Sequence, residues 1–112
     1  MIKRIFYILT TLLVLALLFL AAPWFFPAEF EIVNNSRGPV SVVAAWRSNE
    51  KRIGSIEPLS SHQFSVDDEA AMTFTVLYAD GRQFATEPVY FTSGMEVIAT
   101  ISNDGVDVRY RD

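Results

Sequence analysis

An uncharged, mostly apolar run of 18 residues, 5–22, limits what this chain can fold into more than any other feature. As an α-helix rising about 1.5 Å per residue, the run is about 27 Å long, close to the thickness of about 30 Å of a bilayer's hydrocarbon core. Only Tyr7, Thr10 and Thr11 carry polar groups in it, whereas an amphipathic helix of a soluble protein has polar residues at every third or fourth position. We therefore expect residues 5–26 to form a transmembrane helix.

A cleaved secretory signal peptide is the main alternative for this segment. The apolar region of a signal peptide is usually about 7–15 residues long, and small residues stand three and one positions before the cut. A cut after Ala22 places Leu20 at the outer position, and a cut after Ala28 places Phe26 there. Because neither outer residue is small, the spacing favours an uncleaved signal anchor.

Residues at the two ends of the run predict its orientation. Lys3 and Arg4 precede it and the first charged residues after it are acidic, so the positive-inside rule keeps residues 1–4 in the cytoplasm and places the domain of residues 27–112 outside. Trp24, Phe25 and Phe26 follow the run, and aromatic residues are typical of the headgroup level. We predict a single-pass protein with a cytoplasmic N-terminus.

The composition beyond the anchor indicates one small domain without disulfide bonds. The chain has no Cys, and the part beyond the anchor carries seven basic residues and all thirteen acidic ones, a net charge of −6. An acidic domain is a poor binder of nucleic acid. Because secreted eukaryotic domains of this size commonly contain disulfides, we expect a bacterial inner-membrane protein with a periplasmic domain.

Beyond the anchor the apolar residues recur with a period of two, which is typical of β-strands, and turn residues separate the segments. We expect seven or eight strands, at residues 29–32, 40–47, 52–56, 62–66, 72–78, 82–86, 95–101 and 106–110, with Pro88 interrupting the chain before residues 89–91. The pattern predicts an all-β fold, a small antiparallel β-sandwich of immunoglobulin-like architecture, with a small barrel as the alternative. The layout is similar in outline to small bacterial envelope proteins with one anchor and one sandwich, and this likeness is one of architecture only.

Four local features add detail to this fold. Residues 72–78 are the most β-prone run and are expected in the centre of a sheet. Asp80-Gly81 predicts a hairpin with a type I′ turn. Residues 48–51 are polar and are expected to be a loop, and residues 23–28, with a proline near each end, are expected to form a short hinge before the first strand.

No catalytic, cofactor or metal site is expected. His62 is the only histidine, and adjacent residues on a strand point to opposite faces, so Ser61 and His62 are poorly placed to act as nucleophile and base. The acidic run 67–69 lacks the spacing of a calcium loop and is expected to be a solvated turn. Residues 34–36 fit the glycosylation pattern and are expected to be a plain turn.

Arg109, Tyr110 and Arg111 form the candidate partner site. The first or the last strand should be an edge of a sheet, and such an edge is a template for strand addition by a partner. The two arginines suit either protection of that edge or contact with an acidic partner. Tyr110 is expected to be exposed, whereas Trp46 shares a face with apolar residues and is expected in the core.

These observations predict a non-catalytic binding or structural module that is anchored in the cell envelope, and not an enzyme. The expected partners are the lipid bilayer and another membrane or envelope protein, with no nucleic acid and no small-molecule substrate. Two alternatives stay open: an accessory subunit of a larger membrane complex that docks through its helix, and a small envelope enzyme.

Overall fold

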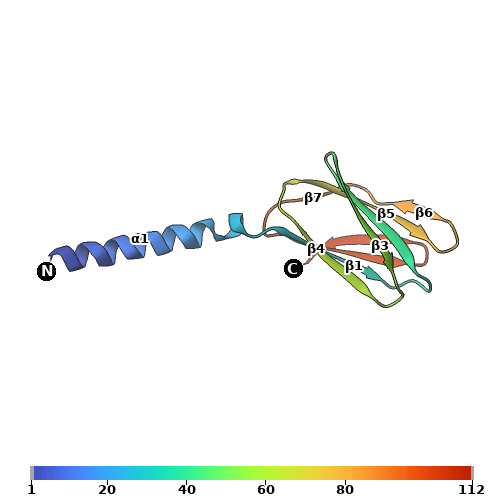
Figure 1. Ribbon diagram of the computed structural model, residues 1–112, viewed down its shortest axis with the longest axis horizontal. Coiled ribbons are helices and arrows are strands. Elements are labelled where there is room, and N and C mark those ends of the chain that lie inside the picture. Colours follow the sequence, from blue (N-terminus) through green and yellow to red (C-terminus); the bar gives the residue numbers. More distant parts are fainter. Residues whose placement is uncertain (1, 112) are drawn as a thin grey trace.

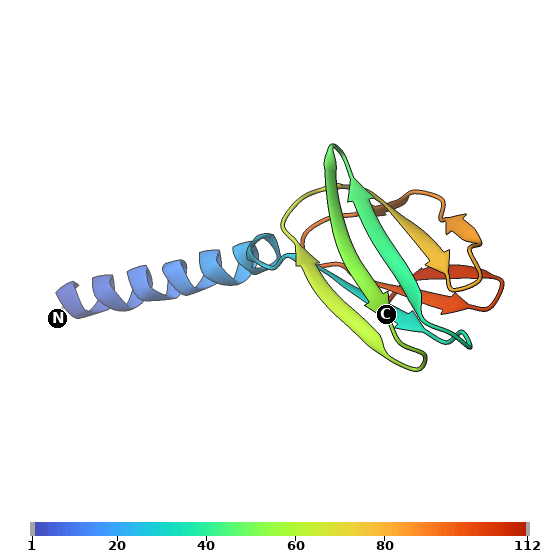
Figure 2. The ribbon, with the colours of Figure 1, turned by 45° about the vertical axis from the view of Figure 1, so that its right-hand side comes forward.

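The computed structural model describes residues 2–111, and the side chains of residues 2 and 18–25 lie outside that description. One helix, α1 (Ile2–Phe25), precedes a domain of two packed β-sheets. The helix extends away from the sheets, as Figures 1 and 2 show, so that the molecule measures 75 × 28 × 21 Å.

The described part of α1 exposes large apolar side chains. Thr10 and Thr11 satisfy their hydroxyls within the helix, by donating to the carbonyl oxygens of Phe6 and Tyr7 at 2.9 and 2.8 Å. Within the residues that the structure describes, no helix is both long enough and apolar enough to cross a membrane.

The described residues of the domain form nine strands, one or two more than expected. The strands are β1 (Ala28–Asn34), β2 (Val40–Trp46), β3 (Asn49–Ile56), β4 (Ser61–Val66), β5 (Ala70–Tyr78), β6 (Gln83–Ala85), β7 (Val89–Phe91), β8 (Glu96–Ser102) and β9 (Gly105–Tyr110). The strand that was not counted is β7, which begins directly after Pro88 and pairs with the first residues of β5, whereas β6 already ends at Ala85. Pro88 lies in the break between the two strands, and the three residues after it rejoin the same sheet.

The strands form a sheet of order β4-β1-β8-β9 and a sheet of order β3-β2-β5-β6, in which β7 also pairs with β5. As predicted, β5 lies inside its sheet. The expectation of an antiparallel sandwich is wrong at one pair, because β1 and β8 are parallel. The strand order also differs from that of immunoglobulin domains, whose second and third strands lie in different sheets, whereas β2 and β3 form a hairpin in one sheet.

Aromatic side chains from both sheets meet in the core, among a larger number of aliphatic ones. Phe30 on β1 stacks on Phe64 with ring centroids 5.0 Å apart. It also meets the edges of Phe91, at 5.0 Å, and Phe74, at 6.2 Å, from the opposite sheet. These contacts join the two layers inside the core. Trp46, at the end of β2, is only half-buried and packs against the margin of the core.

Two turns differ from their predictions. Residues 49–51 belong to β3 rather than to a loop, because a tight turn at Arg47 and Ser48 lets them pair with the end of β2. In the β5–β6 hairpin only Gly81 has a positive φ, of 94°, and its N–H donates to the carbonyl of Tyr78. The type I′ prediction is therefore wrong, and the geometry is that of a three-residue loop whose left-handed position glycine fills without steric cost.

The expected hinge at residues 23–28 is shorter than predicted. The helix continues through Pro23 to Phe25, and Ala28 already lies in β1 with its side chain fully buried. The carbonyl of Phe26 accepts a hydrogen bond of 3.0 Å from the N–H of Gly94, in the loop before β8. Two residues, Phe26 and Pro27, therefore connect helix and sheet.

Candidate functional site

Strand β9 is an edge of its sheet, which agrees with the prediction that placed the partner site there. The N–H of Arg111 donates to the carbonyl of Glu96 at 2.9 Å, so the main-chain groups of Arg111 point toward β8. Because this direction alternates along an antiparallel ladder, the N–H and C=O groups of Val106, Val108 and Tyr110 point to the open side. Three residues of β9 thus offer unpaired main-chain groups to a partner strand.

The two arginines of the candidate site have acidic neighbours within this chain. Arg109 pairs with Asp107 on the outer face of β9 at 2.5 Å. Arg111 reaches across β8 and pairs with Glu31 at 2.7 Å and with Glu96 at 3.5 Å. Arg111 therefore ties the end of the chain to β1 and β8. Contact of this residue with an acidic partner would require these pairs to break.

A groove of about 400 Å³ runs along the inner side of β9, where the two sheets separate. Val106 and Val108 line one wall, and the opposite wall comes from β6, the start of β7 and the residues between them. The full lining is Phe84, Ala85, Thr86, Glu87, Val89, Val106 and Val108. Tyr110 bridges the same gap, because its hydroxyl donates to the carbonyl of Tyr90 at 2.6 Å. The edge therefore combines unpaired main chain with apolar side chains.

The residues expected at the membrane interface lie on and beside α1. Lys3 and Arg4 are exposed on its first turn, and Phe26, directly after its end, has 61% of its surface exposed. The side chains of Trp24 and Phe25 lie outside the described residues.

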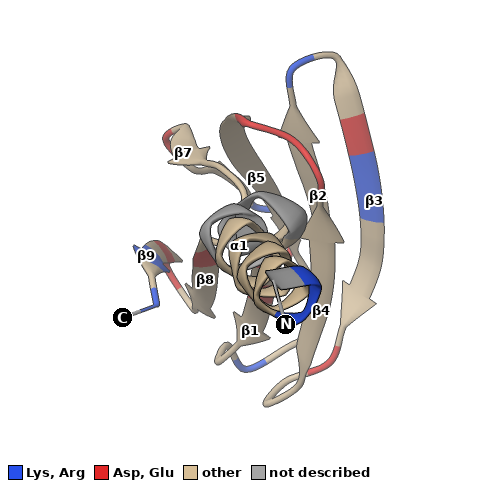
Figure 3. Cartoon of the chain, turned by 90° about the vertical axis from the view of Figure 1, so that its left-hand side faces the viewer, with Lys and Arg blue, Asp and Glu red and all other residues tan. Residues whose placement is uncertain are grey.

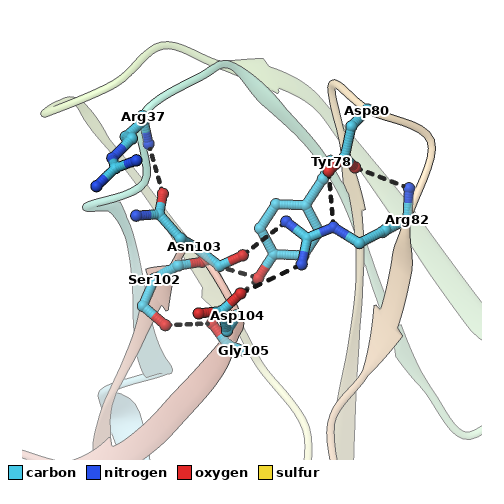
Figure 4. Close-up of polar contacts among 8 residues, drawn as sticks. All are labelled: Arg37, Tyr78, Asp80, Arg82, Ser102, Asn103, Asp104 and Gly105. Atoms are coloured by element: carbon cyan, nitrogen blue, oxygen red, sulfur yellow. Dashed lines mark hydrogen bonds and ion pairs between the residues drawn. The ribbon is translucent and has the colours of Figure 1, made fainter.

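A cluster at the opposite end of the sandwich joins two hairpins through one guanidinium group (Figure 4). The Arg82 side chain contacts Asp80 at 2.7 Å, donates to the carbonyl of Asn103 at 2.8 Å and lies 3.4 Å from Asp104. The guanidinium also covers the ring of Tyr78, 4.8 Å from its centroid. Because these charges already have partners, the cluster acts as a clamp between the sheets rather than as a reaction centre.

Tyr78 is the buried member of that clamp and gives it a pH dependence. Its hydroxyl donates to the carbonyls of Ser102 and Gly105, at 2.9 and 3.2 Å. Burial raises the pKa of this hydroxyl above its ordinary value of about 10, and the charge of Arg82 offsets part of the rise.

Tyr78→Phe should therefore reduce the alkaline sensitivity of folding. Since the folded-state pKa lies above the unfolded one, the hydroxyl's contribution is fully present below about pH 10 and is lost as the pH rises through the folded-state value. The free energy of unfolding, measured in urea between about pH 9 and pH 11, should fall less steeply in the variant than in the parent chain. Equal slopes for both proteins would contradict the assignment.

His62 and its serine neighbour lie as the alternation of a strand predicts. Ser61 is exposed and His62 is half-buried on the inner side of β4, 6.3 Å from the ring of Phe64. Ser61 and His62 thus lie on opposite faces of the strand. Among the described residues, no group of three or more His, Asp or Glu side chains is arranged to hold a metal ion.

The acidic run 67–69 is more than a solvated turn. Asp68 pairs with Arg47 at 3.3 Å, and the Arg47 guanidinium also donates to the carbonyl of Glu69. The Glu69 carboxylate accepts a hydrogen bond of 2.7 Å from Tyr90. The run thereby links the β2–β3 turn to β7, a role that spacing along the sequence does not reveal.

Asn34 has a structural role that its sequence pattern did not predict. Its side chain is fully buried, and its amide donates to the carbonyls of Ile56 and Gly38 at 2.9 and 3.0 Å. Its oxygen accepts hydrogen bonds from the N–H and the hydroxyl of Ser36, at 2.9 and 2.5 Å. The expectation of a plain turn at residues 34–36 is therefore wrong, and burial keeps Asn34 from serving as a glycosylation site in the folded chain.

Comparison with known proteins supports the fold. No protein-family model matches the sequence, and no curated protein matches it significantly. A solved structure described as the NMR structure of the protein from Eubacterium rectale is similar, with a TM-score of 0.59 and 17% sequence identity over 79% of this chain and 91% of that chain. At this level of identity the similarity concerns the fold alone.

Proposed function

We propose that this chain is a membrane-anchored, non-catalytic binding module, in which α1 holds the sandwich at a bilayer and the β9 edge receives a partner strand. The observation that carries the proposal is that the chain has both an apolar helix outside the core and an open sheet edge lined by apolar side chains. Each part has its own support.

The support for anchoring comes from the exposed surface of α1 and from the sequence. Large apolar side chains at residues 5–9 and 12–15 are 49–67% exposed. Because consecutive residues of a helix point in all directions, these positions cover every face. An exposed apolar surface of this kind marks a protein or membrane contact. The apolar sequence continues beyond the described side chains, as far as Ala22.

The support for a binding role comes from a comparison of sheet edges. β3 carries Glu50, Lys51 and Arg52 and a bulge beside Gly54, which are devices that prevent strand addition. The edge strand β4 is mostly polar, and the Lys51 ammonium group lies 5.3 Å from the Phe64 ring beneath it. By contrast, β9 has a regular register without a bulge, and Val106 and Val108 on its inner side line an apolar groove.

Anchoring predicts that the full chain stays in the membrane fraction after alkaline carbonate washing, which removes peripheral proteins. Because the chain has no Cys, single cysteines can report topology. Leu59→Cys, at a position 86% exposed on the sandwich, should react with an impermeant maleimide in intact bacterial spheroplasts. Ile2→Cys should react only after the membrane is opened. Carbonate extraction of the chain, or equal labelling at both positions, would contradict the anchored topology.

A further inference from the structure

We infer that the strand which pairs with β9 is β9 of a second copy of this chain, antiparallel and centred on Val108. The inference names the partner of the proposed binding module and rests on that part of the proposal. It does not depend on the anchoring role of α1.

The main-chain groups fit this register. Val106, Val108 and Tyr110 direct their N–H and C=O groups to the open side. With Val108 opposite Val108 of the second copy, Val106 of each chain lies opposite Tyr110 of the other. All three residues then belong to hydrogen-bonded pairs, and the two sheets become one.

The charges fit the same register. Asp107 and Arg109 flank Val108 and lie exposed on the outer face. Figure 3 colours the acidic and basic segments of β9 red and blue. In an antiparallel pair centred on Val108, Asp107 of each chain lies opposite Arg109 of the other, and opposite charges across strands stabilise a sheet. Centring on Asp107 places the two Asp107 side chains opposite each other, and centring on Arg109 does the same for the arginines. The sequence of β9 is thus its own electrostatic complement in one register only.

The apolar side of the strand is compatible with this pairing. Val106 and Val108 are half-buried and line the groove between the sheets. In the pair, Tyr110 of the second copy lies opposite Val106 on this side, so its ring extends the apolar lining of the groove. A contact of one strand per chain is small for a stable complex, so the association should be weak and dependent on concentration.

The symmetry of the pair determines where it can form. An antiparallel edge pair has its two-fold axis perpendicular to the joined sheet, so the two β1 strands begin at opposite ends. Since only Phe26 and Pro27 separate α1 from β1, the two helices leave in opposite directions. Two chains in one flat membrane cannot pair in this way, whereas chains in facing membranes or in detergent solution can.

The test is sedimentation velocity of the full chain in non-ionic detergent, with charge reversals at two exposed positions. The parent chain should show a concentration-dependent dimer. Asp107→Arg alone and Arg109→Asp alone each place like charges opposite each other and should weaken self-association at least about tenfold. An equimolar mixture of the two variants restores both opposite-charge pairs and should restore the dimer.

Recovery in the mixture is the decisive result, because a variant that had lost its fold could not recover by mixing. A parent chain that stays monomeric, single variants that associate as the parent does, or a mixture that stays monomeric would each overturn the inference. Failure of the carbonate and labelling tests would instead overturn the anchoring. The two proposals therefore fail independently.

Discussion

Phe30→Ala should leave the sandwich only marginally stable at room temperature. The Phe30 ring is 1% exposed and contacts three other aromatic rings, from both sheets. Removing it creates a cavity where the layers meet, at a cost of about 3–5 kcal/mol. Small domains have total stabilities near the lower end of about 5–15 kcal/mol. The loss should therefore consume most of the folding free energy.

Denaturant unfolding of residues 27–112, followed by fluorescence, gives the measurement, since Trp46 is the only tryptophan in that segment. Its core is built from residues of the sandwich alone. Phe84→Ala is the matched control, because the Phe84 side chain is 38% exposed at the groove, and it should cost about 1 kcal/mol or less. Similar losses for both variants would show that Phe30 is not the junction of the layers.

Asn34→Ala should cost about 2–4 kcal/mol, an unusually large effect for a polar residue at the end of a strand. The Asn34 side chain makes four hydrogen bonds while fully buried. Removing it leaves the Ile56 carbonyl and the Ser36 N–H without these partners, and each buried unsatisfied group costs about 1–3 kcal/mol. Urea unfolding of the same segment measures the change.

Asn35→Ala is the control for this prediction. Asn35 is exposed, and the hydrogen bond of 2.8 Å that it donates to Ile101 comes from its main chain, which the substitution retains. Its effect should stay within about 0.5 kcal/mol. If Asn34→Ala were equally mild, the buried amide would not be what holds the end of β1.

Alternation of apolar residues predicts the strands whose inner faces build the core. β5 is one example, because its burial alternates along its whole length. The same signal fails for the first half of β3, where residues 49–51 are polar and exposed and pair only because the preceding turn returns them to β2. A strand that forms because a neighbouring strand pairs with it, and not because one of its faces is buried, shows no alternation of apolar and polar residues.

Most of what the sequence does not reveal about this fold is the pairing of segments that lie far apart in the chain. Residues 29–34 of β1 pair with residues 96–101 of β8, and nothing in either segment indicates a parallel partner. The clamp around Arg82 is also a contact between distant parts of the sequence, because Asn103 and Asp104 reach it from a different sheet. The edge position of β9 was expected from the sequence, whereas the self-complementary arrangement of its charges can be recognised only once the open side of the strand is known.

The parallel pair of β1 and β8 also sets an order of assembly for the growing chain. β1 is the first strand to be synthesised, yet it lies between β4 and β8. The other sheet can begin to assemble as soon as β2, β3 and β5 have emerged, since β2 and β3 are consecutive strands. In its own sheet, β1 can pair with β4 once residue 66 has emerged, but the β1–β8 pair must wait until residue 102 has emerged, because loop closure over so long a separation precedes any gain from the contact. Until β8 has emerged, Phe30 and Ile32 therefore lack part of the packing that buries them, and they lie close in sequence to the apolar helix.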